Sequence, residues 1–450
     1  MTKFDKNQTT GMKANKTRIT ALVIAFLLPV WLPAQTVREE IEANRDKAGY
    51  VYSMYDFDTP AIAKAPKGYK PFYISHYGRH GARFSGSNSE FVKVRSILLA
   101  ASREDNLTDL GKDVLRRYET VFPLVDNRAG DLTRKGYAQQ KKLAARMMRN
   151  FPEVFRKKGK VHVDARSTTR ARCIMSMAAF CEGLKEKYPG IGITRTTGAS
   201  EMAVLNPFTE YNPEMEPLKP LTDTLTKIID EYSERVVDPH APLTRLFKDV
   251  SGIARFGSER EIESMFYRTA SFIQNTDSEA RFWDIFTLDE MVAHSKVSNC
   301  NYFLLYGPDT LYQGGRRWSS IHLTMEDIIS KAVQDIASGE TDVRLRFGHD
   351  IMIIPMLAFL GVEGWDKPMA SLEEIAEGWH CNRVPVASNI QFVFYRNKKD
   401  DILVRVLYNE RDIELPIGST MAPFYNWTDF KAFCDRQIAL TRELVSNTNN

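Results

Sequence analysis

The sequence predicts an α/β protein with a mostly parallel central sheet, flanking helices and an inserted, mostly helical cap. Three observations predict this class. A short apolar strand, a charged turn and a helix follow one another at three places. Two long polar stretches between these units have helical periodicity, and a pair of apolar strands stands near the end. Repeated strand–helix units favour a parallel sheet, whose ligands bind beyond the carboxyl ends of its strands.

Residues 1–34 are expected to form a cleaved signal peptide. Residues 1–35 hold five of the 61 Lys and Arg residues and one of the 57 Asp and Glu residues, so they account for the whole net charge of +4. An apolar run, Ile19–Leu28, follows the basic stretch, and Ala34 offers a small residue before cleavage. Pro29 and Pro33 argue against an uncleaved membrane anchor, which is the alternative. We therefore expect a periplasmic or secreted protein with no membrane contact after cleavage.

The rest of the chain is formally neutral, which argues against a nucleic-acid partner because such partners require a basic face. The five cysteines include no Cys-x-x-Cys pair and no cluster with histidine, so neither a zinc site nor another metal or cofactor is expected. Cys173 and Cys181 stand eight residues apart on a predicted helix, a rise of about 12 Å that is too long for a disulfide.

The first strand–turn–helix unit begins with "PFYIS", Pro71–Ser75, and continues into "HYGRHGARF". Two glycines bracket Arg79 and His80, and glycine lets a backbone approach a ligand closely. The guanidinium groups of Arg79 and Arg83 suit phosphate oxygens. Like charge on both sides lowers the pKa of His80, and a neutral imidazole is a competent nucleophile. A basic surface turn with a chance histidine is the alternative.

The other two units add further anion-binding or acid–base groups. "KVHVDA", Lys160–Ala165, precedes a helix that carries Arg172 in its first turn, where the helix dipole favours anions. "DVRLRF", Asp342–Phe347, precedes His349 and Asp350, which can bind phosphate and supply a general acid. Taken singly, Arg172 is most simply a solvated charge and Asp350 a helix cap. Together the three turns predict one site at one edge of the sheet.

The remaining chain divides into cap and core segments. "IQFVFYR" and "ILVRVLY" flank "NKKDD" and predict a strand pair, and "NWTDFKAFCDRQIALTREL" predicts a terminal helix. We expect the α/β core to comprise residues 36–89 with 156–200 and 298–450. The helical cap is expected to comprise residues 90–155 and 201–297.

The motifs resemble those of the histidine acid phosphatases, the group that includes phytases and multiple inositol-polyphosphate phosphatases. "RHGARF" resembles the signature R-H-G-x-R-x-P, and "FGHDIMIIPMLAFLG" resembles the His-Asp motif of that family. "LTRKGYAQQ", "RCIMSMAAFCEGL" and the closing strands resemble further family segments, so the likeness runs from Pro71 to Pro416. The resemblance implies a phosphoglycerate mutase-like fold.

Two positions depart from the family pattern. Ser85 stands where the family usually has proline, which bears on loop stiffness. His349-Asp350-Ile351 stands where the multiple inositol-polyphosphate phosphatases usually carry His-Ala-Glu. This second departure places the chain nearer to typical acid phosphatases and phytases.

The resemblance implies roles for six residues and an acidic pH optimum. His80 would attack the phosphorus of a phosphomonoester, and Asp350 would protonate the leaving oxygen and then activate water. The residues implied to hold the phosphoryl group are Arg79, Arg83, Arg172 and His349. No step in this scheme requires a metal.

The substrate is expected to be a small phosphomonoester, with inositol phosphates such as phytate as one possibility and sugar phosphates as the alternative. Two other functions are disfavoured. A non-catalytic phosphate-binding protein would be expected to lack His80 or Asp350, but both are present. A mutase would find its substrate in the cytoplasm, whereas this chain is expected to be exported. The oligomeric state and the order of attack on an inositol ring are left open. "RKKGK" at Arg156–Lys160 is most simply a solvated loop. "GGRRW" at Gly314–Trp318 is most simply a solvated turn, with a place in the lining of a polyanion pocket as the alternative. His76 is expected to have a structural role or to lie at the rim of the site.

Overall fold

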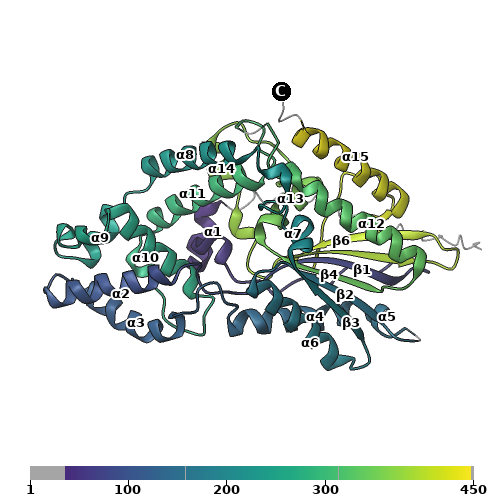
Figure 1. Ribbon diagram of the computed structural model, residues 1–450, viewed down its shortest axis with the longest axis horizontal. Coiled ribbons are helices and arrows are strands. Elements are labelled where there is room, and N and C mark those ends of the chain that lie inside the picture. The colour runs from purple at the N-terminus through teal and green to yellow at the C-terminus, as the bar shows by residue number, and fades with distance from the viewer. Residues whose placement is uncertain (1–35, 158, 313, 447–450) are drawn as a thin grey trace, which may run out of the picture. The chain divides into compact units, whose positions relative to one another are not determined.

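The computed structural model describes residues 36–446 except 158 and 313 (Figure 1). The expected signal peptide, residues 1–34, lies outside the described residues. The described part of the chain forms one compact unit that begins at Thr36. None of its helices is both long and apolar enough to span a bilayer.

An eight-stranded sheet lies at the centre, with the strand order β3-β2-β4-β1-β5-β6-β7 and with β8 paired to β6. Its strands β1 to β4 are parallel to one another, whereas β5 to β8 run antiparallel to their neighbours. The predicted α/β class is therefore confirmed, and so is the predicted strand pair, which forms β5 and β6. The strands span Lys70–Arg79, His162–Ser167, Gly192–Thr197, Val343–Gly348, Asn389–Arg396, Ile402–Tyr408, Arg411–Asp412 and Phe424–Asn426 for β1 to β8 in turn.

Helices cover both faces of the sheet (Figure 1). On one face lie α12 (His322–Ser338), α13 (Asp350–Phe359) and α15 (Trp427–Ser446). On the other lie α4 (Arg134–Asn150), α5 (Pro152–Phe155) and α6 (Ala171–Lys187). Side chains alternate along β1, so Tyr73 and Tyr77 join the apolar core under α13 while Ile74 joins the core under α6.

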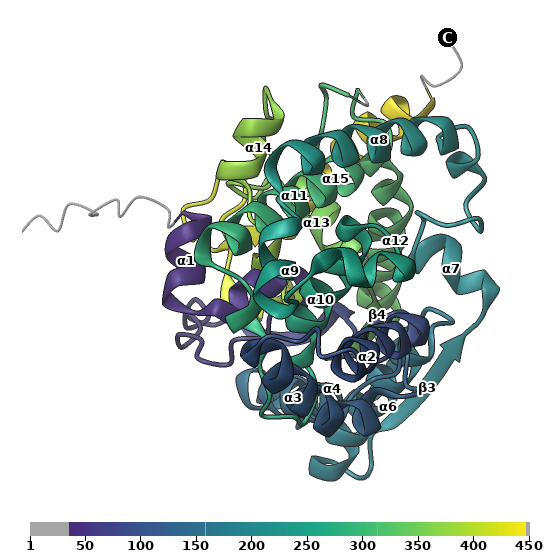
Figure 2. The ribbon, with the colours of Figure 1, turned by 90° about the vertical axis from the view of Figure 1, so that its left-hand side faces the viewer.

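A second group of helices lies beyond one end of the sheet and faces the viewer in Figure 2. Six of the helices, α1, α2, α3, α9, α10 and α11, contribute to an apolar core separate from those beside the sheet. The other helices are α1 (Val37–Ala43), α2 (Asn88–Arg103), α3 (Asp109–Val125), α7 (Ala199–Leu205), α8 (Lys219–Val236), α9 (His240–Leu246), α10 (Glu259–Ile273), α11 (Leu288–Tyr306) and α14 (Leu372–Gly378). The 3-10 segments are η1 (Arg45–Tyr52), η2 (Pro213–Met215), η3 (Val250–Phe256), η4 (Trp283–Ile285), η5 (Trp318–Ile321) and η6 (Cys381–Arg383).

The packing of α4 and α5 differs from the expected division into cap and core. Both fall in the segment 90–155 that was expected in the cap, but Leu143, Met147 and Phe151 lie in the core between the sheet and α6. An amphipathic stripe predicts that one face of a helix is buried, but it does not say against which partner. Of the helices in this segment, α2 and α3 instead join the apolar core beyond the end of the sheet.

The cysteines lie in the interior. All five are buried and none forms a disulfide. The expectation that Cys173 and Cys181 do not pair is confirmed, since both lie on α6.

Candidate active site

Three polar turns meet at the carboxyl ends of β1, β2 and β4. These strands are neighbours and run in parallel, with Arg79 of β1 opposite Gly348 of β4. The amide of His80 donates to the carbonyl of Gly348 at 3.0 Å, and the amide of Thr168 donates to that of Phe347 at 3.1 Å. The sheet register therefore brings the six residues singled out in the sequence to one edge.

His80 is held by its backbone on two sides and by its ring on a third. Its carbonyl accepts from the amide of Ala387 at 2.9 Å, which complements the bond to Gly348. Its ring nitrogen Nδ1 lies 2.9 Å from the carbonyl oxygen of Gly81. Because a carbonyl oxygen only accepts, Nδ1 carries the hydrogen and Nε2 keeps its lone pair. His80 therefore presents an unprotonated nitrogen at a fixed place.

The imidazole of His80 stays neutral at ordinary pH. Burial lowers its pKa well below 6.5, and the positive charges of Arg79, Arg172 and Arg83 lower it further. Only 1% of the residue is exposed. The sequence-based expectation of a lowered pKa is thus met, but burial is the larger cause.

Arg79 and Asp350 form a buried ion pair at the centre of the site. Nη2 of Arg79 lies 2.9 Å from Oδ2 of Asp350, and the arginine side chain is fully buried. Its other terminal nitrogen, Nη1, donates to the carbonyls of Val51 at 2.6 Å and Val384 at 2.9 Å. Burial alone would raise the pKa of Asp350, but the charges of Arg79 and Arg83 hold it below 3.8. Without a ligand Asp350 is therefore a carboxylate.

Arg83 and Arg172 supply two further guanidinium groups. Arg83 donates from Nη1 to the carbonyl of Phe84 at 2.9 Å and lies 4.9 Å above the ring centroid of Tyr52. Arg172 occupies the second position of α6, and burial together with the charge of Arg83 lowers its pKa below 12.5. Nε of each arginine is buried and has no hydrogen-bond partner among the described residues. An oxyanion between them would satisfy these donors.

His349 closes the remaining side. It is the residue before the first turn of α13, and its Nε2 lies 3.3 Å from the hydroxyl of Thr168. Burial and the charge of Arg172 lower the pKa of His349 to about 3. The rings of His349 and His80 lie edge to face with centroids 5.7 Å apart. His349 is therefore a second neutral imidazole beside the first.

Sequence reasoning missed the side chains that fix the backbone of the first turn. Gln140 donates to the carbonyl of Arg79 at 3.0 Å, Gln139 accepts from the amide of Ala82 at 2.8 Å, and Ser176 accepts from the amide of Gly81 at 3.1 Å. The two glutamines belong to the motif "LTRKGYAQQ". Their position on the buried side of an amphipathic helix was the available signal, because buried amides need partners.

A strained segment near the beginning of the described chain also supports the site. Tyr50 has φ 42° and ψ −124°, a backbone conformation that is rare for a residue with a side chain. The next residue, Val51, turns its carbonyl onto Arg79, and Tyr52 lies beneath Arg83. No motif in the sequence singled out these residues, because a backbone acceptor leaves no trace in residue identity.

His76 and Arg317 both lie in the interior of the protein. His76 is buried with its ring 5.4 Å from that of Phe180 and 5.6 Å from that of Phe347, as expected for a structural role. The prediction of a solvated turn for "GGRRW" is wrong for Arg317, which is buried with its guanidinium 5.3 Å from the ring centroid of Tyr306. The face of an aromatic ring attracts a guanidinium and can replace some of its hydration. A hydropathy scale does not include this interaction, so it predicts that such an arginine is exposed. Within the described residues, no three His, Cys, Asp or Glu side chains gather as metal ligands would.

Comparison with known proteins gives consistent relatives. Residues 78–409 match the family model described as the histidine phosphatase superfamily (branch 2). Human multiple inositol polyphosphate phosphatase 1 is 22% identical over 389 residues, which cover 77% of this chain and 76% of that protein.

Two solved structures share the fold. The multiple inositol polyphosphate phosphatase of Bifidobacterium longum, crystallised with inositol hexasulfate, superposes with a TM-score of 0.70 at 18% identity, over 86% of this chain and 97% of that one. The phytase from D. castellii superposes with a TM-score of 0.65 at 14% identity, over 88% of this chain and 85% of that one. At these identities the superpositions establish the fold.

Proposed function

The chain belongs to branch 2 of the histidine phosphatase superfamily, and we propose that it hydrolyses inositol polyphosphates outside the cytoplasm through a phosphohistidine on His80. Its general activity is that of a phosphoric monoester hydrolase. The observation that carries the proposal is the free Nε2 of His80. Burial and the charges of Arg79, Arg172 and Arg83 keep the ring neutral, and the hydrogen bond from Nδ1 to Gly81 leaves the lone pair on Nε2.

In the first step, Nε2 of His80 attacks the phosphorus of a phosphomonoester while the bond from phosphorus to the ester oxygen breaks. Arg79, Arg83, Arg172 and His349 bind the phosphoryl oxygens and hold the phosphorus in line. This arrangement stabilises the charge of the transition state with groups that are already in place, since two of the four are fixed to backbone atoms.

Asp350 gives the leaving oxygen its proton. In the ligand-free site it is ionised because of Arg79, but a bound phosphate dianion brings negative charge close to it and competes for the same arginine. Both effects raise the pKa of Asp350, so Asp350 becomes protonated in an acidic medium and can act as the general acid. In the second step Asp350 takes a proton from water as the water attacks the phosphohistidine. The bond from phosphorus to nitrogen breaks and inorganic phosphate leaves.

The likeness to two multiple inositol polyphosphate phosphatases and to a phytase supports inositol polyphosphates as substrates. The basic N-terminal stretch, its apolar run and Ala34 support export. A general or sugar-phosphate acid phosphatase is the second candidate. This second candidate is favoured by His349-Asp350, because the multiple inositol-polyphosphate phosphatases usually carry His-Ala-Glu at this place.

Phosphate release from phytate and from p-nitrophenyl phosphate, followed between about pH 3 and pH 7 on the chain without residues 1–34, tests the proposal. Separation of the ring products gives the order of attack. Turnover of p-nitrophenyl phosphate without phytate turnover would favour the second candidate. His80→Ala is expected to abolish turnover and to prevent trapping of an alkali-stable phosphoprotein on rapid quenching. Turnover in that variant would refute the assignment of the nucleophile.

Export has its own test. Expression of the whole chain in a bacterium, followed by fractionation and N-terminal sequencing, is expected to give a protein outside the cytoplasm that begins near residue 35. Full-length protein in the cytoplasm would refute this part of the proposal.

A further inference from the structure

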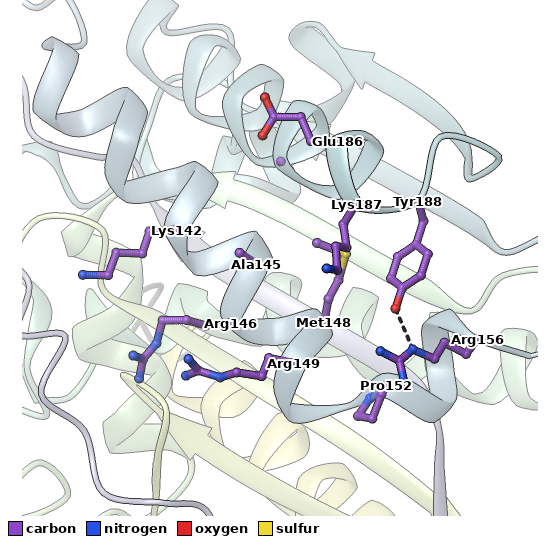
Figure 3. Close-up of a pocket in the computed structure, with 11 residues that line it drawn as sticks. Lys142, Ala145, Arg146, Met148, Arg149, Pro152, Arg156, Glu186, Lys187 and Tyr188 are labelled. Carbon is purple, nitrogen blue, oxygen red and sulfur yellow. Dashed lines mark hydrogen bonds between the residues drawn. The ribbon is translucent and has the colours of Figure 1, made fainter.

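A cavity lies away from His80, between α4, α5 and the end of α6 (Figure 3). Its volume is about 700 Å³, which falls in the usual range for small-molecule sites of roughly 300–1,000 Å³. None of the six candidate catalytic residues lines it. Gln140 of α4 donates to the carbonyl of Arg79, beside His80, whereas Arg149 of the same helix lines the cavity. At about 1.5 Å per residue, some 14 Å of helix separates the two.

The wall of this cavity is strongly cationic. Five basic side chains line it and only one carboxylate, that of Glu186, does so; the five are Lys142, Arg146, Arg149, Arg156 and Lys187. The carboxylate is already paired, since Glu186 binds Lys141, and in Figure 3 it points away from the arginines. Arg146 is neutralised by Glu410, which is only 2% exposed and lies 2.7 Å away.

The four other cations form no ion pair with any residue that the structure describes. Arg156 donates from Nε to the hydroxyl of Tyr188 at 2.8 Å, which leaves its two terminal nitrogens for other partners. The hydrogen bond to Tyr188 is the main cause that raises the pKa of Arg156, and Glu153 adds to it from a distance. All four side chains are exposed, and an anion bound beside Arg149, Arg156 and Lys187 would be attracted by each of them.

Helix dipoles explain only part of this charge. Arg149 lies in the last turn of α4 and Lys187 in the last turn of α6, where a cation offsets the negative end of a helix. Lys142 lies in the middle of α4, and its ammonium lies 4.0 Å from the ring centroid of Phe57. Arg156 is the C-cap residue of the four-residue α5. Phe57 therefore accounts for Lys142, and Arg149, Arg156 and Lys187 are the cations that remain available to a ligand.

The wall also includes apolar groups. Ala145, Met148, Pro152 and Gly183 line the cavity, and the ring of Tyr188 lies beside them. A guanidinium is a fork that matches phosphate oxygens, so Arg149 and Arg156 favour phosphate over a simple halide. The apolar surface favours a ligand whose phosphate is attached to an apolar body.

We propose that this cavity is a second anion site, which binds a phosphate or phosphonate monoester-like group attached to an apolar body. Two sources have this chemistry: a free alkyl or aryl phosphate and the headgroup region of an anionic phospholipid. The proposal does not depend on the hydrolysis proposed for His80, because it rests on other residues and involves no reaction.

Calorimetric titration with hexylphosphonate tests the site, since a carbon–phosphorus bond resists hydrolysis. The double variant R149A/R156A is expected to lose one binding event of the wild type, or about tenfold or more in its affinity. R172A is expected to weaken only the event at the active site. R149K/R156K keeps the positive charges but loses the guanidinium groups, and its affinity for hexylphosphonate is expected to lie between those of the wild type and R149A/R156A. R103A/R116A, which removes two exposed arginines from α2 and α3, is the matched control and is expected to bind as the wild type does.

Turnover of p-nitrophenyl phosphate by R149A/R156A at the wild-type rate shows that the variant is folded. If that folded variant binds hexylphosphonate as the wild type does, or if the wild type binds only at the R172A-sensitive site, the proposal is overturned. Sedimentation with vesicles of phosphatidic acid and phosphatidylcholine then separates the sources. Vesicle binding that R149A/R156A abolishes identifies the lipid, and hexylphosphonate binding without vesicle binding identifies the free anion.

Discussion

Replacing Asp350 with asparagine separates its proposed task as an acid from its task as the partner of Arg79. Asparagine keeps an oxygen that can accept from Arg79, but it has no negative charge and no proton to give. Removing one partner of a buried ion pair costs about 3–5 kcal/mol. Because the amide oxygen preserves the hydrogen bond to a charged donor, and because 13% of the Asp350 side chain is exposed, we expect the free energy of unfolding to fall by roughly 1–3 kcal/mol.

The catalytic loss should depend on the leaving group. A general acid contributes about 10²–10⁴ in rate, which corresponds to roughly 3–5 kcal/mol of barrier. An inositol or alkyl oxygen leaves poorly without a proton, so the full loss is expected with phytate. p-Nitrophenolate leaves readily as an anion, so its phosphate ester should lose about tenfold or less.

The assay is kcat for both substrates in the wild type and in Asp350→Asn, with urea unfolding of each protein as the control for folding. In the wild type, kcat should fall as pH rises through the pKa of ligand-bound Asp350, and this limb should vanish in the variant. Equal losses on the two substrates would refute the role of Asp350 as the acid. A loss that tracks the unfolded fraction would reduce its role to holding Arg79.

Three further predictions concern the support of the site and of the fold. Ser176→Ala leaves the buried amide of Gly81 without its acceptor and should lower the free energy of unfolding by about 1–3 kcal/mol in urea, whereas Ser176→Thr should restore part of it. Glu410→Ala leaves Arg146 and the hydroxyl of Tyr55 without their buried partner and should cost roughly 3 kcal/mol in the same assay, while Glu410→Gln should cost less. Although burial opposes it, Nδ1 of His380 at 3.3 Å, a hydrogen bond from Asn382 and the charge of Arg383 lower the pKa of Glu40 to about 2 from 4.5. Its stabilisation is therefore complete above pH 4.5 and is lost as pH falls toward 2, so Glu40→Gln should destabilise the protein at pH 6 and have little effect near pH 2. An equal effect of Glu40→Gln at both pH values would contradict this reasoning.

The elements that carry the site were predictable because local signals and sheet topology agree there. Apolar runs ending in glycine, arginine and histidine predicted β1 and β4, and parallel pairing then placed His80 beside His349. The six candidate residues could be found from the sequence because each belongs to a short motif with a chemical reason for its residue types.

The rest was not predictable, because it depends on partners distant in the sequence. The amphipathic pattern of α4 gave its buried face but not the fact that this face covers the sheet. The carbonyls of Val51 and Val384, which hold Arg79, are identical in kind to every other carbonyl of the chain. Arg317 looked solvated because its charge is visible in the sequence and its aromatic neighbours are not.

The two carbonyls that hold Arg79 also bear on how the protein is made. One lies 28 residues before the arginine and the other 305 residues after it. β1 likewise lies between β4 and β5, both of which are synthesised more than 250 residues after it. A chain emerging from the ribosome, or from a membrane pore, cannot complete this arginine's surroundings until nearly all of it is present. Closing such long loops before their contacts form is slow, so folding should be late and all at once. An incomplete chain would then have no working phosphate site, and activity would appear only after the last strands have joined the sheet.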